Sequence, residues 1–402
     1  MNVVVKKSTA SGKVFAPPSK SMAHRLLVCA ALSEGESEIS GISLCDDVLA
    51  TANCLRALGA EIEIKERFAK VRGISPQNIS PRDVLNCNES GSTLRFLIPV
   101  ASLGGKIVEF SGTEKLLSRP LSVYEKLFYE NGGRITSSAT RLTVVGKICG
   151  GDIEVPGDIS SQFITGLLFS LPTLDVDSRI KITTKVESRP YIELTRAAMA
   201  DFGVYVIWED EQTLFVKGGQ RYVPRKICVE GDFSGTANLD AFNLIGGDVE
   251  VLGLPQNSLQ GDKVYREHFS NLKDGFCEIN IEDCPDLGPI LFTAAAALHG
   301  GKFIGTRRLR IKESDRAYAM ASELSKFGAQ IELYENEAII KKSSLHTPSE
   351  ILCAHNDHRI VMALTVLSSV YGGEISGAEA VNKSYPEFFE DIKSLGIDFL
   401  KV

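Results

Sequence analysis

Apolar and polar positions alternate along the chain in two recurring patterns. In the first, a short polar run opens a long apolar stretch, which in several copies ends at Gly before a run rich in β-branched residues. This pattern predicts a capped, buried helix followed by a returning strand. Six such openings occur: Ser19-Lys20-Ser21, Ser90-Gly91-Ser92-Thr93, Ser160-Ser161-Gln162, Ser234-Gly235-Thr236, Pro285-Asp286-Leu287-Gly288 and Asn356-Asp357-His358-Arg359.

The second pattern is an amphipathic helix that ends at Gly before another strand. Apolar positions recur at i, i+3 and i+4 before each Gly, and this spacing predicts a helix with one buried face. The six residues are Gly59, Gly133, Gly203, Gly275, Gly328 and Gly396, with gaps of 74, 70, 72, 53 and 68 residues. One αβ unit is therefore predicted to recur six times, about every 70 residues, with one short copy.

The repeats predict a division into two domains. A chain of 402 residues is long for one core, so two domains of three units each are expected. The Gly- and Pro-containing stretch 218–225, half-way along the six units, is the predicted seam. The short unit, around residues 257–283, lacks part of the usual return, and an irregular or trimmed edge is expected there.

Charge and cysteine content narrow the functional classes. The formal net charge of −7 and the pI of about 5.6 argue against general binding to nucleic acid or anionic membranes, but they allow a local cationic cleft. The nine cysteines contain no C-x-x-C pair and are odd in number, so reduced and mostly buried thiols are expected. No apolar run suits a bilayer span or a signal-peptide core, and the cytoplasm is the expected compartment.

Cations gather at the helix openings and in the loops before them. Many stand beside Ser, Thr or Gly, and the free backbone N–H groups of a helix start can bind an anion. For the Ser19-Lys20-Ser21 opening taken alone, an ordinary Ser cap beside solvated cations is the favoured explanation. Recurrence favours a site for small metabolites that carry phosphate and carboxylate groups. The set is Lys20, Arg25, Arg95, Arg119, Arg189, Lys312, Arg316, Arg359 and Lys383.

Two carboxylates stand within this cationic set. Asp286 opens an apolar helix, and Glu313 lies between Lys312 and Arg316. Carboxylates among cations are candidates for proton transfer, while the alternatives are a helix N-cap for Asp286 and a salt bridge for Glu313. A metal cluster of His355, Asp357 and His358 lacks a distant third ligand pattern, so neither a metal nor another cofactor is expected.

Nine short motifs follow one another along the chain and together point to a family. They are Ser19-Lys20-Ser21 with Arg25, Glu89-Ser90-Gly91-Ser92-Thr93-Leu94-Arg95, Ser118-Arg119-Pro120, Ser160-Ser161-Gln162-Phe163, Ser188-Arg189-Pro190-Tyr191, Pro285-Asp286, Lys312-Glu313-Ser314-Asp315-Arg316, Asn356-Asp357-His358-Arg359 and Asn382-Lys383-Ser384-Tyr385-Pro386. In this order they resemble the 5-enolpyruvylshikimate-3-phosphate synthase family, also called 3-phosphoshikimate 1-carboxyvinyltransferase. Each motif is weak alone, but nine in this order are highly specific.

The resemblance implies a fold and a domain division. The family's fold has two similar α/β domains, each built from three repeats of a β-α-β-α-β-β-type unit as an inside-out α/β barrel. The chain crosses twice between the domains. For this sequence the resemblance implies a first domain at residues 13–222 and a second at residues 1–12 and 223–402, with crossings near residues 12 and 222.

The resemblance also implies a reaction and its residues. The family joins the 5-hydroxyl of shikimate 3-phosphate to C2 of phosphoenolpyruvate, with protonation at C3 and then loss of phosphate. Matching positions for shikimate 3-phosphate are Lys20, Ser21, Arg25, Ser160, Ser161, Gln162, Ser188, Tyr191, Asp286 and Lys312. Those for phosphoenolpyruvate are Lys20, Gly91, Arg119, Gln162, Arg316, Arg359 and Lys383. Asp286 would take the 5-hydroxyl proton and Glu313 would exchange the proton at C3, with Lys20 as the rival for one transfer.

Departures and rival families complete the expectations. Glu89 and Arg308 stand where many relatives have Asn. A sister transferase acting on UDP-N-acetylglucosamine places a Cys before its Arg-Pro, and the loop 112–120 has none. RNA 3′-end cyclisation fits poorly with the acidic balance, and a non-catalytic anion-binding relative would not need both carboxylates. The expected partners are the two small substrates, without nucleic acid or membrane, and the expected state is a monomer.

Overall fold

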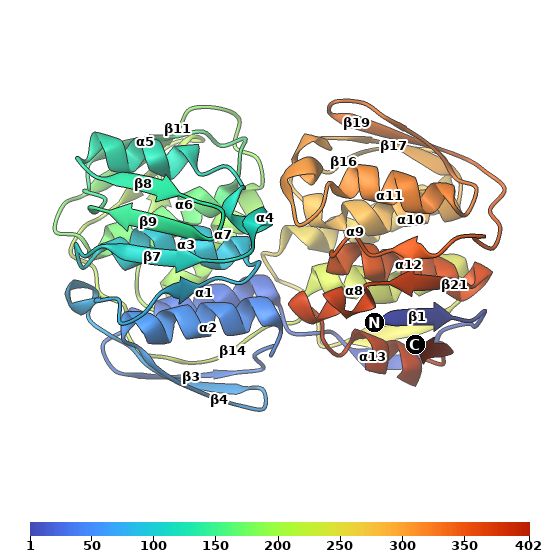
Figure 1. Cartoon of the computed structure of the whole chain (residues 1–402), viewed down its shortest axis with the longest axis horizontal. Coiled ribbons are helices and arrows are strands. Elements are labelled where there is room, and N and C mark those ends of the chain that lie inside the picture. The colour runs from blue at the N-terminus through green and yellow to red at the C-terminus, as the bar shows by residue number, and fades with distance from the viewer. The chain divides into compact units, whose positions relative to one another are not determined.

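The computed structural model describes residues 1–402, and the chain divides into two compact units. Residues 18–230 form the continuous unit, and residues 1–17 together with 231–402 form the composite unit. Each unit has its own hydrophobic core. In Figure 1 the continuous unit runs from blue to green, and the composite unit contains the yellow-to-red part together with the dark-blue β1 (Asn2–Val5).

The middle repeat of the continuous unit shows the pattern in full. Its elements in chain order are β6 (Leu85–Asn86), α3 (Gly91–Ser102), β7 (Val108–Ser111), α5 (Ser122–Glu130), β8 (Arg134–Ser137) and β9 (Arg141–Val145). Strands β6 and β7 pair in parallel across the buried helix, and the hairpin β8–β9 adds to β7 in antiparallel register. The resulting sheet has the strand order β6-β7-β9-β8.

Four further repeats build sheets of the same kind. In the continuous unit they use β14 (Lys226–Cys228), α1 (Lys20–Ala31), β3 (Glu36–Ser40), α2 (Asp46–Leu58), β4 (Glu61–Lys65) and β5 (Phe68–Arg72), and then β10 (Asp152–Val155), α6 (Ser161–Ser170), β11 (Ser178–Ile182), α7 (Arg189–Asp201), β12 (Val206–Trp208) and β13 (Thr213–Val216). In the composite unit they use β16 (Glu278–Asn280), α10 (Gly288–Ala297), β17 (Gly300–Ile304), α11 (Arg316–Ser325), β18 (Gln330–Leu333) and β19 (Glu337–Lys341), and then β20 (Leu352–Cys353), α12 (His358–Tyr371), β21 (Gly373–Ser376), α13 (Phe388–Ser394), β22 (Phe399–Lys401) and β1.

The sixth repeat is the trimmed one. Its sheet contains only β2 (Ser11–Phe15) and β15 (Asp248–Leu252), which pair in parallel. Helix α8 (Phe233–Asp240) precedes β15, and the 3-10 turn η4 (Gly261–Val264) then leads into the second helix, α9 (Tyr265–Asp274). No hairpin follows α9, and the chain passes directly into β16. The short gap between two Gly positions thus corresponds to a missing pair of strands.

Two strands are exchanged between the units. Strand β2 precedes α1 in the sequence but pairs with β15, and β14 precedes α8 but pairs with β3. Each strand stays with the sheet it pairs with, so the crossings fall between Pro17 and Pro18 and between Glu230 and Gly231. They lie later than the expected positions near 12 and 222, because sequence patterns do not show which sheet a leading strand joins.

Helices lie inside each unit and sheets lie outside. Every residue of α3 except Ser92 is buried, and α3 packs against α6. The outer strands alternate, as in β5, where buried positions lie between exposed charged or aromatic ones. One face of each such sheet therefore covers the helices while the other faces water.

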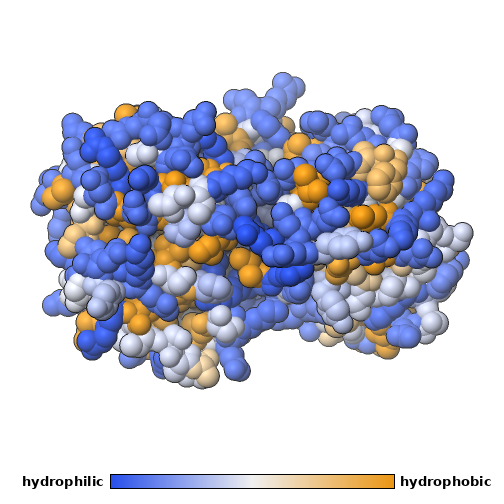
Figure 2. All heavy atoms as spheres, turned by 90° about the horizontal axis from the view of Figure 1, so that it is seen from above, coloured by the Kyte–Doolittle hydropathy of each residue, from blue (hydrophilic) through white to orange (hydrophobic).

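The surface agrees with the acidic, polar composition. Hydrophilic residues dominate the face seen in Figure 2, and apolar residues are scattered among them. None of the helices combines the length and the apolar character needed to span a bilayer. All nine cysteines are free thiols, and Cys29, Cys45, Cys54, Cys87 and Cys284 are buried.

Candidate active site

Serine caps define three of the helix starts in the continuous unit. The hydroxyls of Ser19, Ser90 and Ser160 accept hydrogen bonds from backbone N–H groups of α1, α3 and α6, at 3.3, 3.2 and 3.3 Å. These serines are therefore ordinary caps, as the plainer explanation supposes. The residues after each cap, including Lys20, Ser21 and Ser161, occupy the first helical turn, where backbone N–H groups point outward.

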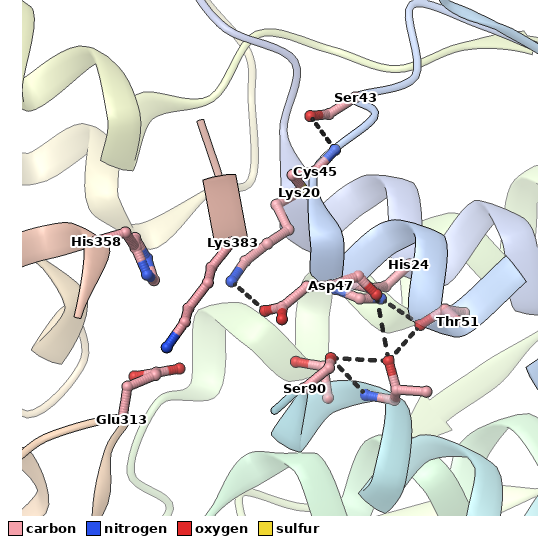
Figure 3. Close-up of polar contacts among 12 residues, drawn as sticks. Lys20, His24, Ser43, Cys45, Asp47, Thr51, Ser90, Glu313, His358 and Lys383 are labelled. Atoms are coloured by element: carbon pink, nitrogen blue, oxygen red, sulfur yellow. Dashed lines mark hydrogen bonds and ion pairs between the residues drawn. The ribbon is translucent and has the colours of Figure 1, made fainter. Parts of the chain in front are cut away.

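Lys20 is held by a carboxylate that the sequence analysis did not single out. Its Nζ lies 2.8 Å from Oδ2 of Asp47, at the start of α2, and their side chains are only 14% and 11% exposed. The hydroxyl of Thr93 contacts the backbone oxygen of Asp47 at 3.4 Å. Figure 3 shows this pair beside a buried chain of polar contacts.

That chain of contacts joins α1, α2 and α3. His24 Nδ1 lies 2.7 Å from the Thr51 hydroxyl, which lies 2.6 Å from the Thr93 hydroxyl, and Thr93 donates to Ser90 at 2.7 Å. Burial lowers the pKa of His24 well below its ordinary value, and the charges of Lys20 and Arg25 lower it further. His24 is therefore neutral near pH 7, and the network is uncharged.

The start of α3 is tightly packed against the predicted phosphoenolpyruvate ligands. A Cβ on Gly91 would lie 2.7 Å from a terminal nitrogen of Arg119 and 3.7 Å from Oε1 of Gln162. Gln162 donates to the hydroxyl of Ser92 at 3.0 Å and accepts from Arg95 at 2.8 Å. The structure thus brings Gly91, Arg119 and Gln162 together, and Nε of Arg119 is buried without a hydrogen-bond partner.

Arg25, a predicted shikimate 3-phosphate ligand, is buried and makes several contacts with the protein. It is 3% exposed and donates to the Thr195 hydroxyl at 2.9 Å and to the backbone oxygens of Ser21 and Tyr191 at 2.6 and 3.0 Å. Burial lowers its pKa to about 10, so it stays charged at neutral pH. Arg25 therefore fixes the backbone beside two other predicted ligands. Ser188, at the start of α7, is buried in a left-handed conformation with φ 58°.

In the composite unit the predicted residues converge on one carboxylate. Oδ1 of Asp286 lies 2.8 Å from Arg316 and 3.2 Å from Lys312, and Oδ2 lies 3.0 Å from Arg359. Glu313 accepts from the other terminal nitrogen of Arg316 at 2.6 Å. Asp286 is not a helix cap, because α10 begins after Leu287 without a side-chain cap. Glu313 does form the salt bridge that the plainer explanation proposed.

Arg316 is the hub of this cluster and is itself anchored by Asp357. The guanidinium is 1% exposed, and its Nε donates to the fully buried Asp357 at 2.8 Å. Burial would lower the pKa of Arg316, but Asp357, Glu313 and Asp286 raise it above its ordinary value. Burial would raise the pKa of Asp357, but Arg316 lowers it below its ordinary range. Both groups are therefore charged at neutral pH.

The remaining cations of the composite unit have distinct surroundings. Burial lowers the pKa of Lys312, as do Arg308 and Arg316, against the opposing effect of Asp286. Arg308 therefore adds positive charge next to a predicted shikimate 3-phosphate ligand. Lys383 donates to the backbone oxygen of Asn356 at 2.6 Å, and Figure 3 shows its side chain extending toward Glu313.

The turn that receives Lys383 is strained. His355 and Asn356 both have positive φ, 49° and 54°, directly before the α12 cap Asp357. Nonglycine residues adopt this conformation at a cost that surrounding contacts must offset. His355 Nε2 lies 2.8 Å from the buried Glu323, which also accepts from the backbone N–H of Cys353 at 2.8 Å. No group of three His, Cys, Asp or Glu side chains is placed to hold a metal ion.

The contacts of two positioning residues, Arg95 of the cationic set and Asp357, were not predicted from the sequence. Arg95 orients Gln162 and also donates to the backbone oxygen of Pro120 at 3.2 Å, beside Arg119. Asp357 anchors Arg316, the hydroxyl of Ser314 at 3.0 Å and the start of α12. Both lie within quoted motifs, so a signal existed, but their partners are distant in sequence and the pairing could not be read from spacing.

A fold of repeated αβ units, with arginines and carboxylates interleaved at its helix starts, is typical of an enzyme that transfers groups between small anionic substrates. Residues 4–392 match the family model described as EPSP synthase (3-phosphoshikimate 1-carboxyvinyltransferase). The chain belongs to this family.

Relatives and solved structures agree with this assignment. The 3-phosphoshikimate 1-carboxyvinyltransferase of Clostridium novyi (strain NT) is 41% identical over 425 aligned residues, covering 98% of this chain and 97% of the relative. That of Clostridioides difficile (strain 630) is 41% identical over 420 residues, covering 97% and 96%. A 2.37 Å structure of EPSP synthase from Acinetobacter baumannii covers 100% of both chains with a TM-score of 0.80 at 22% identity. The expected fold is confirmed by this similarity.

Proposed function

We propose that this enzyme transfers the enolpyruvyl group of phosphoenolpyruvate to the 5-hydroxyl of shikimate 3-phosphate and releases phosphate. The observation that carries the proposal is the cluster around Asp286. One carboxylate receives Arg316, Lys312 and Arg359, while Glu313 shares Arg316. A binding protein for anions gains nothing from carboxylates here, because they compete with the ligand for the same cations. Such carboxylates are useful where protons must be moved.

The addition step removes one proton and adds one, and the elimination step removes a second proton. The 5-hydroxyl oxygen forms a bond to C2 of phosphoenolpyruvate and loses its proton to Asp286, while C3 receives a proton. The resulting tetrahedral intermediate loses phosphate from C2 and a proton from C3, which restores the double bond. Glu313 is the proposed partner at C3, with Lys20 as the rival. General acid–base catalysis of this kind contributes about 10²–10⁴-fold in rate.

The cations and hydroxyls have complementary roles. Phosphoenolpyruvate carries a phosphate and a carboxylate, for which Arg119, Arg316, Arg359, Lys20 and Lys383 are the proposed ligands. Shikimate 3-phosphate would be held by the first turns of α1, α6 and α7. Asp286 and Glu313 balance the charge of Arg316 and Arg359. An incoming anion would replace these carboxylates and free them to accept protons.

The acceptor test separates this proposal from its nearest rival. Purified enzyme is incubated with phosphoenolpyruvate and either shikimate 3-phosphate or UDP-N-acetylglucosamine, and phosphate release is measured. Release only with shikimate 3-phosphate is expected. Release only with UDP-N-acetylglucosamine, or with neither acceptor, would contradict the proposal. We further propose a cytoplasmic monomer, which the nine free thiols support for the compartment; sedimentation of the active enzyme tests the monomer.

A further inference from the structure

The trimmed repeat brings a further buried carboxyl group to the Asp286 cluster. Asp262 lies in η4, in the loop between β15 and α9 of this repeat, and is 5% exposed. Gln260 fixes this segment against the start of α8. Its side-chain oxygen accepts from the backbone N–H of Phe233 at 3.0 Å, and its side-chain nitrogen donates to the backbone oxygen of Gly231 at 2.8 Å. The position of Asp262 is therefore built by specific contacts.

One hydroxyl and one guanidinium connect Asp262 to Asp286. Ser234, in the first turn of α8, is hydrogen-bonded to the Asp262 side chain. The same hydroxyl accepts from one terminal nitrogen of Arg359. The other terminal nitrogen of Arg359 donates to Asp286 at 3.0 Å. Because the Ser234 hydroxyl has one proton, it donates to an ionised Asp262 while it accepts from Arg359.

The surroundings of Asp262 make its charge responsive near neutral pH. Burial raises its pKa to about 7; Asp286 and Asp232 raise it as well, and Arg359 opposes them. The Cys284 thiol also faces it, and burial raises the pKa of that thiol well above its ordinary value, so it stays neutral. Elsewhere on α8 and α9, the Tyr265 hydroxyl donates a hydrogen bond to Asp240, and Nε2 of His268 lies 3.9 Å from Sγ of Cys284. Near pH 7 both forms of Asp262 are therefore populated.

We propose that Asp262 is a positioning residue whose protonation is coupled to the binding of phosphoenolpyruvate at Arg359. The ionised form attracts Arg359 through Ser234 and adds a negative charge near the anion site. The neutral form lacks that charge, so the Arg359 guanidinium attracts the substrate anion more strongly. Linkage is reciprocal, so a bound anion must favour proton uptake by Asp262 to the same degree. This inference rests on the proposed function only in assigning phosphoenolpyruvate to Arg359.

The first test compares the wild-type enzyme with Asp262→Asn, which keeps the shape and resembles the neutral acid. KM for phosphoenolpyruvate is measured with saturating shikimate 3-phosphate between pH 6 and 8.5. The ratio of the wild-type KM to the variant KM cancels the ionisation of the substrate itself. The ratio should rise about fivefold between pH 7 and pH 8, because the neutral fraction of Asp262 falls from about one half to about one eleventh over that unit. The control is Asp274→Asn, an exposed change at the end of α9, whose KM should show the same pH dependence as that of the wild type.

A ratio that stays constant across this pH range would overturn the proposal, since a purely structural role for Asp262 would change KM equally at every pH. A second measurement needs no variant. Sulfate is a dianion that does not titrate in this pH range. Its binding to the wild-type enzyme is measured by calorimetry in two buffers that differ in their heat of ionisation. Uptake of about half a proton per sulfate is expected at pH 7, and no uptake would overturn the proposal. If the wild type lacks turnover with shikimate 3-phosphate, the proposed function fails, while the sulfate result still tests Asp262.

Discussion

The two units hold their cations in different ways. At the candidate site of the continuous unit, Arg25 and Arg95 donate to neutral hydroxyl, amide and backbone oxygens, while Lys20 pairs with the carboxylate of Asp47. In the composite unit Arg316 and Arg359 both donate to carboxylates. Neutral hydrogen-bond acceptors leave the positive charge of an arginine available to a substrate anion. Carboxylate partners neutralise that charge until a substrate anion displaces them. The continuous unit is thus suited to recognition, and the composite unit to proton transfer.

The largest expected effect comes from the carboxylate of the composite unit. Asp286→Asn keeps the side-chain shape but removes the proposed base, so kcat should fall by about 10²–10⁴-fold. Affinity for shikimate 3-phosphate should change little, because its proposed ligands lie mainly in the continuous unit. Steady-state kinetics and equilibrium binding measure the two effects. Asp283→Asn, an exposed change in the same segment, is the control. Normal turnover by Asp286→Asn would rule out its role as base.

The buried ion pair between Arg316 and Asp357 should contribute more to stability than any surface ion pair. Asp357→Asn removes one partner of a fully buried pair and leaves the Arg316 charge poorly compensated, which costs about 3–5 kcal/mol. Thermal unfolding measured by calorimetry should show a clear drop in Tm. The control is Glu332→Gln, which removes an exposed pair with Lys341 in the same unit and should cost at most about 1 kcal/mol. Equal Tm values for both variants would contradict the distinction between buried and surface pairs.

Loss of a cation from the continuous unit should weaken binding of the donor substrate. Arg119→Ala removes a charged hydrogen-bond donor worth about 1.5–3 kcal/mol, so KM for phosphoenolpyruvate should rise about ten- to hundredfold. Arg134→Ala, an exposed change on β8, serves as the matched control. An unchanged KM would remove Arg119 from the site.

A smaller effect is expected from crowding at the start of α3. In Gly91→Ala the new Cβ would approach Arg119 to 2.7 Å, so the guanidinium must shift by a few tenths of an ångström or more. We expect KM for phosphoenolpyruvate to rise by about tenfold or less, since tenfold corresponds to about 1.4 kcal/mol. In the double variant with Arg119→Ala the effect should largely vanish, because the clash is gone. Simple additivity of the two effects would argue against a clash with Arg119.

The smallest expected effect concerns the contribution of the buried, neutral His24 to the stability of the continuous unit at low pH. The pKa of His24 is lowered by burial in the folded protein, so the unfolded chain binds a proton more readily below about pH 6.5. Stability from the neutral His24 is therefore present above that pH and is lost as pH falls, by at most about 1.4 kcal/mol per unit. His24→Asn should make the Tm difference between pH 7.5 and pH 5.5 smaller. An unchanged difference would show that His24 does not contribute to it.

Much of the fold could be predicted because its signals are local. The Gly that ends α2, with φ 117°, is a short-range feature, and so are the serine caps before α1, α3 and α6, which occur in all three repeats of the continuous unit. The exchange of β2 and β14 could not be predicted, since parallel partners lie far apart in sequence. The crossings were misplaced for that reason.

The candidate site was predictable as a set of residues but not as a set of contacts. Asp286, Glu313 and Arg316 carry motif signals, yet nothing in their spacing shows that Asp357 anchors the arginine. Asp262 lies in the trimmed repeat, where the sequence indicated only an irregular edge. Its relation to Arg359 through Ser234 depends on how the loop between β15 and α9 packs against the start of α8, which is a property of the folded unit.

The division between recognition and proton transfer is tested most directly by binding of shikimate 3-phosphate alone to two variants, Ser161→Ala and Glu313→Gln. Calorimetry gives the affinity, and phosphate release gives the turnover of the same preparations. The account predicts weakened shikimate 3-phosphate binding for Ser161→Ala, and wild-type affinity with turnover largely lost for Glu313→Gln. Equal loss of affinity in both variants would contradict it, because the carboxylates of the composite unit would then serve recognition as well.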